Sequence, residues 1–63
     1  MYEFGIYYRV GSESWQKVQD GFETMEAAVS ALPVWANLHK DATGWKIEQE
    51  PAYPDGYGYG YER

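Results

Sequence analysis

The stretch that decides the fold is residues 1–10, which read MYEFGIYYRV. Large apolar or aromatic side chains stand at every even position, and glutamate, glycine, tyrosine and arginine stand between them. A period of two in a segment rich in aromatic residues is typical of a strand with one buried face. This is the longest clean alternation in the chain, so we expect it to form the central strand of a sheet.

The following residues predict an antiparallel hairpin. Turn-forming residues occupy positions 11–14, and they leave the loop length ambiguous. A three-residue loop places apolar residues opposite one another and pairs Tyr2 with Phe22, Ile6 with Val18, Tyr7 with Lys17 and Arg9 with Trp15. Asp20 then falls on the buried face, so we expect a bulge or a strand end near Asp20-Gly21. The second strand is accordingly predicted at about residues 14–19.

A helix is predicted to begin at Met25. Thr24 is a favourable N-cap, and Glu26 complements the helix dipole in the first turn. Apolar residues at helical spacing form the predicted buried stripe, and they are Met25, Ala28, Val29 and Leu32. Pro33 lacks a backbone donor, so the pattern predicts either one helix to Lys40 that is kinked near Pro33 or two short helices meeting there. Val34, Trp35 and Leu38 are expected to supply the apolar contacts of the second part.

Residues 45–50 alternate again and predict the third strand. Trp45 and Ile47 are expected to point inward and Lys46, Glu48 and Glu50 outward, before Pro51 ends the strand. The order β-β-α-β predicts an α+β two-layer sandwich, with a three-stranded antiparallel sheet in spatial order 2-1-3 and one helix, kinked or split at Pro33, on one face. The alternative, strands two and three adjacent and parallel, is rare in so small a sheet. We expect a single domain at 1–51 and a Tyr/Gly-rich tail at 52–63.

Composition narrows the function classes. The 63 residues contain no cysteine and no apolar run near the ~20 residues that span a bilayer. We therefore expect a cytoplasmic protein with no membrane association. Ten acidic and five basic side chains give a net charge of −5, which argues against a duplex nucleic acid as partner and favours a basic protein surface.

No set of residues in the sequence predicts catalysis. His39 is the single histidine, and its position predicts a surface residue near the end of the helix. Ser12 and Ser14 have no neighbouring base, and the glycines of residues 56–60 lack the lysine of a phosphate loop. The outward glutamates are interpreted as a solvated acidic face. We therefore expect no enzyme, no catalytic residue, no metal and no cofactor.

Two surfaces are candidates for binding. The first is acidic and consists of Glu3, Glu23, Glu26, Glu48 and Glu50. The second is the sheet face away from the helix, where aromatic and basic side chains resemble the platform of single-strand binders. It consists of Tyr7, Arg9, Trp15 and Lys17, beside Gly5. The tail tyrosines, Tyr57, Tyr59 and Tyr61, either cover this second surface or add to it.

Three segments carry a resemblance to a known class of proteins. They are FETMEAA at 22–28, then Trp35, then GWKI at 44–47. Their layout resembles that of small acidic bacteriophage proteins that inhibit host proteins, and the resemblance covers residues 22–50. It implies a protein that occupies a host protein's surface in the host cytoplasm, with a nucleic-acid enzyme or a defence complex as the target.

The leading functional hypothesis is therefore a small acidic protein-binding module, specifically a phage-encoded inhibitor that acts by surface occupation. The alternative is a weak single-stranded nucleic-acid binder that uses the aromatic sheet face. A third hypothesis is an accessory subunit that adds its edge strand to a partner's sheet. The sequence leaves open whether the chain is a monomer or a homodimer.

Overall fold

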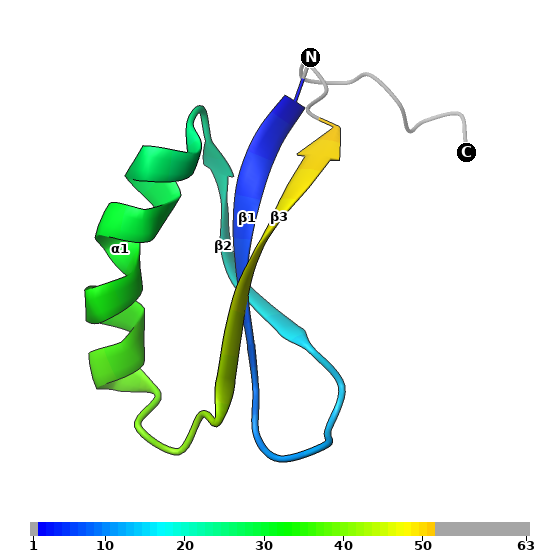
Figure 1. The fold of residues 1–63 in the computed structure, drawn as a ribbon, viewed down its shortest axis with the longest axis vertical. Helices are drawn as coiled ribbons and strands as arrows, with labels where there is room; N and C mark the ends of the chain where they lie inside the picture. The colour runs from blue at the N-terminus through cyan, green and yellow to red at the C-terminus, as the bar shows by residue number, and fades with distance from the viewer. Residues whose placement is uncertain (1, 52–63) are drawn as a thin grey trace.

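The computed structural model describes residues 2–51, and the expected tail at 52–63 lies outside them. Its elements are β1 (Tyr2–Arg9), β2 (Gln16–Phe22), α1 (Met25–Leu38) and β3 (Gly44–Pro51). The strands form an antiparallel sheet in the order β2-β1-β3, and α1 packs on one side of it (Figure 1). The predicted α+β fold, its element order and the central place of the first strand are therefore confirmed.

The β1–β3 pair is regular along its whole length. Eight successive pairs run without a break from Tyr2 with Pro51 to Arg9 with Gly44. Ile6 faces Ile47, and Tyr8 faces Trp45, so the alternating apolar residues of both strands meet on the side that α1 covers. Ile6 has 0% of its surface exposed and forms the centre of the small core.

The β1–β2 pair departs from the predicted register. Tyr7 faces Lys17 as expected, but Ile6 faces Gln19 rather than Val18. Phe4 takes the place predicted for Tyr2 and faces Phe22. The register shifts on both sides of Ile6, because β2 carries extra residues there.

These irregularities explain where the second strand lies. A bulge was expected near Asp20-Gly21, and Gly21 adopts a φ of 86°, a conformation that glycine accepts readily. The shift turns Asp20 away from the core and lets Gln19 face α1, where Gln19 Oε1 accepts a hydrogen bond of 2.9 Å from Trp35 Nε1. The strand can then continue to Phe22, so the predicted range of 14–19 was wrong at both ends.

The helix begins where the sequence predicts. Thr24 has an extended backbone, and its Oγ1 accepts a hydrogen bond of 3.1 Å from the Ala27 amide. Pro33 lies inside a single α-helix that ends at Leu38, so neither a second helix nor an extension to Lys40 forms. Val29, which loses its backbone partner at Pro33, is on the exposed side, where water can satisfy its carbonyl.

The face of α1 that packs on the sheet is rotated from the predicted stripe. Ala28 is fully buried, and Leu32 and Trp35 are half-buried. Four apolar side chains remain 46–64% exposed along the flanks of the helix, and they are Met25, Val29, Val34 and Leu38. The prediction that Val34 and Leu38 supply core contacts was therefore wrong. Because apolar residues surround most of α1, their spacing alone did not define the buried side.

His39 belongs to an aromatic cluster rather than to the open surface. Its ring centroid lies 4.3 Å from that of Tyr8, 6.0 Å from Trp35 and 6.3 Å from Trp45. The His39 amide also donates to the Trp35 carbonyl and closes the end of α1. The prediction of a surface histidine was wrong, because the turn after α1 folds the imidazole into the layer between helix and sheet.

Candidate functional site

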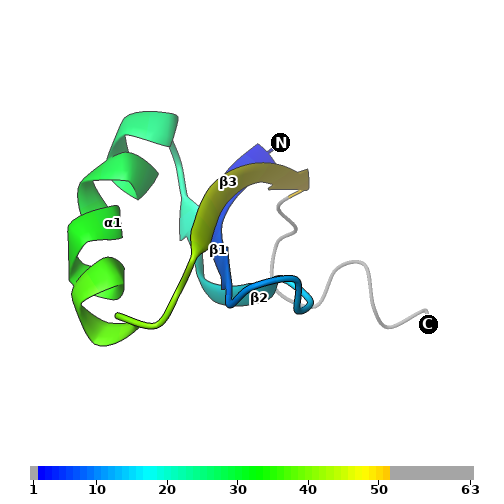
Figure 2. The same cartoon turned by 60° about the horizontal axis from the view of Figure 1, so that its bottom comes forward.

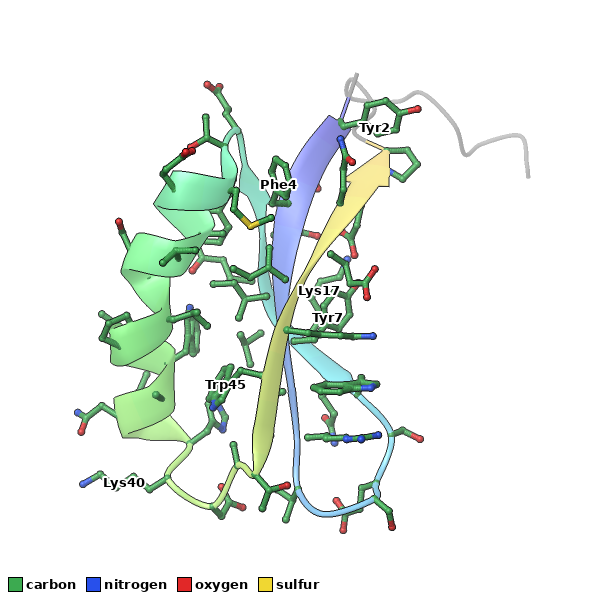
Figure 3. All side chains as sticks on the ribbon, viewed as in Figure 1. Tyr2, Phe4, Tyr7, Lys17, Lys40 and Trp45 are labelled. Carbon is green, nitrogen blue, oxygen red and sulfur yellow. The ribbon has the colours of Figure 1, made fainter. Side chains whose placement is uncertain are left out.

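One face of the sheet is not covered by any described element (Figure 2). We call this side, turned away from α1, the open face. Tyr7 and Lys17 project from it, whereas Phe4 and Trp45 project from the opposite side toward α1 (Figure 3). The open face also carries Glu3, Gly5, Arg9, Trp15, Asp20, Gly44, Lys46, Glu48 and Glu50.

Cations lie over both aromatic rings of the open face. The Arg9 guanidinium is 4.5 Å from the centroid of Trp15, and Lys46 Nζ is 4.7 Å from the same ring. Tyr7 has Lys46 at 5.4 Å and Lys17 at 5.7 Å from its ring centroid. The structure thus brings together the four residues predicted for this face. Lys46 was not predicted to join them, although its outward position opposite Tyr7 was a usable signal.

Two glycines make room on this face. A Cβ atom on Gly44 would lie 3.3 Å from Trp15 Cη2, and one on Gly5 would lie 3.1 Å from Glu50 Oε1. Neither glycine has a positive φ, so each is needed for the space that it leaves and not for an unusual backbone conformation. Each glycine therefore leaves room for a neighbouring side chain, an edge of the Trp15 ring at Gly44 and the Glu50 carboxylate at Gly5.

A polar network holds Glu50 on the open face. The Tyr7 hydroxyl donates to Glu50 Oε2, and Lys17 Nζ donates to Glu50 Oε1 at 3.0 Å and to Asp20 Oδ2 at 3.1 Å. The hydrogen bond to Glu50 raises the pKa of Tyr7 above 10.0, because ionised tyrosine could no longer donate it. The pKa of Lys17 is also raised, first by its hydrogen bond to Glu50. Glu50 is therefore a fixed carboxylate rather than a free outward one.

Carboxylates gather at one end of the molecule. β1 starts there, β2 and β3 end there, and α1 begins there (Figure 1). Carboxylate oxygens of Glu3, Asp20 and Glu50 lie within 4.8 Å of one another. We define the acidic end as Glu3, Asp20, Glu23, Glu26 and Glu50.

Four of the five predicted acidic residues thus lie in the acidic end. Glu48 lies one position nearer the middle of the same face, opposite Gly5, and forms an ion pair of 3.1 Å with Lys46. Asp20 was not predicted to contribute, because the predicted register turned it toward the core. The bulge in β2 is what places it beside Glu3 and Glu50.

Exposed apolar side chains border the acidic end. Tyr2, the first residue of β1, is 62% exposed, and Met25, the first residue of α1, is 46% exposed. Figure 3 shows Tyr2 at this end and Lys40 at the other. Near Lys40 the charges are mixed, since Arg9 is the last residue of β1 there and Glu13 and Asp41 belong to the adjoining turns. The charge of the described residues is therefore unevenly distributed along the molecule.

The surface of residues 2–51 has no pocket. Glu3, Asp20 and Glu50 could together offer three oxygen ligands to a cation. The Lys17 ammonium already bonds two of these carboxylates, and so it supplies positive charge where a metal ion would. The site is therefore a flat, charged surface with apolar neighbours.

The fold and this surface define a small α+β domain with one sheet face that no element of residues 2–51 covers. No protein-family model matches the chain, and no curated protein or solved structure matches it either. Among the described residues, no helix is both long and apolar enough to cross a membrane.

Proposed function

We propose that the chain is a protein-binding module whose acidic end occupies a basic surface on another protein. The observation that carries this proposal is the approach of Glu3, Asp20 and Glu50 to within 4.8 Å of one another. Unit charges about 4 Å apart repel by about 1 kcal/mol even in water. Lys17 offsets part of this repulsion, and lysine or arginine side chains of a partner would offset the rest.

The apolar neighbours support an interface rather than a solubility device. Tyr2 and Met25 expose large side chains at the same end of the molecule as the carboxylates. Protein interfaces combine apolar or aromatic anchors with a polar rim, and tyrosine and methionine are enriched among the anchors. The acidic end therefore offers both long-range attraction and short-range contact area.

The flat surface supports binding by occupation. Small-molecule sites are concave, and residues 2–51 form no pocket. The proposal accordingly assigns the chain no catalytic step and no cofactor. Its specific form is a phage-encoded inhibitor of a nucleic-acid enzyme or defence complex in the host cytoplasm. The negative net charge of the chain supports an inhibitor of this kind. Proteins that bind nucleic-acid phosphates present basic surfaces, and an acidic chain can bind to such a surface.

The geometry of the open face supports the alternative function, single-stranded nucleic-acid binding, less than it supports protein binding. Bases stack on free aromatic faces. Cations already lie over Trp15 and Tyr7, so a base would have to displace Arg9 or Lys46. Glu48 and Glu50 on the same sheet face would also repel phosphates.

Affinity capture with matched variants tests the proposal. Glu23→Gln/Glu26→Gln removes two charges at the acidic end, and Glu13→Gln/Asp41→Asn removes two at the other end. We expect the wild type and the second variant to retain the same basic protein from lysate. The first variant should retain it about fivefold less well, because each lost charge pair contributes a few tenths of a kcal/mol or more. Equal retention by both variants would contradict the proposal.

A further inference from the structure

The two edges of the sheet differ in regularity. β3 pairs with β1 along eight residues without a shift, and none of the residues 2–51 pairs with its outer side. The β2 edge is broken by two register shifts and by the positive φ of Gly21. Unpaired backbone groups on a regular edge strand pair readily with another strand, whereas bulges discourage this pairing. β3 is therefore the edge suited to pair with a further strand.

We propose that β3 pairs antiparallel with β3 of a second copy of the chain, with the two-fold axis at Ile47. We consider a closed two-fold pair with both helices on the same side of the joined sheet. Side chains directly opposite each other must then point to the same face, so the axis runs midway between one residue and its own copy. With the axis at Ile47, Lys46 faces Glu48 of the second copy, and Glu48 faces its Lys46. Residues directly opposite on one face interact, and opposite charges stabilise the pair.

The neighbouring registers are less complementary. An axis at Lys46 places two lysines face to face. An axis at Glu48 places two glutamates face to face, and it pairs Lys46 with Glu50, whose carboxylate already bonds Tyr7 and Lys17. An axis at Trp45 leaves much of β3 (Gly44–Pro51) unpaired. The register centred on Ile47 is thus favoured by both charge and overlap.

The rest of β3 fits the same register. On the helix side Ile47 meets its own copy and Trp45 meets Gln49, and both Trp45 and Ile47 retain exposed surface that this contact would cover. On the open face Glu50 lies opposite Gly44, which has no side chain of its own, so Glu50 would contact the edge of the Trp15 ring that lies there. Pro51, which lacks a backbone donor, falls outside the paired residues. The dimer would contain a sheet in the order β2-β1-β3-β3-β1-β2 and no regular edge.

Charge reversal at the two positions tests the register. Lys46→Glu places a glutamate at both of the facing positions, 46 and 48, and Glu48→Lys places a lysine at both, so each variant should oppose its own pairing. We expect the wild type to sediment at twice the 7.3 kDa of one chain, and each variant to have a dimer dissociation constant about tenfold larger than that of the wild type. Lys40→Glu and Glu13→Lys make the same charge changes outside β3 and should leave the dimer intact.

A mixture of the two variants separates pairing between chains from effects within one chain. Both variants lose the Lys46–Glu48 ion pair within their own strand. Only in a heterodimer does each glutamate face a lysine, so an equimolar mixture should recover the wild-type dissociation constant. A wild-type chain that is monomeric at about 0.5 mM, or a mixture no tighter than its components, would overturn the proposal.

Discussion

Tyr7 and Glu50 are 43 positions apart, and the Tyr7 hydroxyl donates a hydrogen bond to the Glu50 carboxylate across the open face. Glu50 Oε1 accepts from Lys17 Nζ at 3.0 Å, so one carboxylate joins all three strands. The pair lies where the acidic end meets the row of cations and aromatic rings. It thus links the two surfaces that the sequence predicted separately.

This hydrogen bond predicts a loss of stability in alkali. The pKa of Tyr7 is raised in the folded chain from 10.0. Its contribution to the free energy of unfolding is therefore complete below about pH 10, and it is lost as the pH rises through the pKa of Tyr7 in the folded chain. Lys17, whose pKa is raised from 10.5, acts in the same direction. Glu50 and Lys46 of β3 and Lys17 of β2 are the charged groups around the ring.

Urea unfolding of wild type and Tyr7→Phe between about pH 8 and pH 11 measures this effect. The free energy of unfolding should fall more steeply above pH 10 in the wild type than in the variant. Tyr2→Phe is the control, since Tyr2 is 62% exposed, and it should follow the wild type. Parallel curves for all three proteins would contradict the assigned role of Tyr7.

Gly5 is predicted to be required for the position of Glu50. The Cβ atom of Gly5→Ala would lie 3.1 Å from Glu50 Oε1, so the carboxylate must move and its hydrogen bonds weaken. We expect a loss of about 1 kcal/mol in urea melts, the typical net value of such a bond. In a Glu50→Ala background the same change should be neutral or stabilise by about 0.5 kcal/mol, because alanine restricts the unfolded chain. An equal loss in both backgrounds would show that the clash is elsewhere.

The small core predicts a strong dependence on Ile6. Its side chain is fully buried, and Ile6→Ala should cost about 2–5 kcal/mol in denaturant melts. A loss of this size is a large share of a small domain's total stability. Val34→Ala removes a side chain that is 61% exposed and should change stability by less than about 0.5 kcal/mol. Similar losses for the two variants would mean that the core lies elsewhere.

Removal of residues 52–63 tests the predicted domain limits. The three described strands and the helix that packs on them all lie within residues 2–51. A chain ending at Pro51 should therefore still unfold cooperatively, with a midpoint close to that of the full chain. Loss of the cooperative transition would place the tail within the domain.

Local patterns were sufficient to predict the architecture. The alternation of residues 1–10 identified the central strand, and Thr24 identified the start of α1, because both signals depend on neighbours in sequence. The register next to the turn, with Tyr7 opposite Lys17, also followed from the loop. The order 2-1-3 followed from placing the longest apolar strand in the middle.

Contacts between distant segments were harder to predict. A bulge was expected near Asp20-Gly21, but the hydrogen bond from Trp35 to Gln19, which then faces α1, is a contact that no local pattern contains. The position of His39 among Tyr8, Trp35 and Trp45 depends on how the turn after α1 folds. Lys46 joined the aromatic face only because β3 aligns it with Tyr7. Each of these features requires the assembled sheet.

The most direct test of the central claim is the rate at which the chain associates with its captured basic protein at two salt concentrations. Charge steering is screened over about 8–10 Å at physiological salt, so the wild-type rate should fall between about 50 and 300 mM salt. Glu23→Gln/Glu26→Gln should start slower and depend less on salt, while single-stranded DNA should not bind at micromolar concentration. A salt-independent rate, or DNA binding that Tyr7→Ala or Trp15→Ala abolishes, would contradict the account.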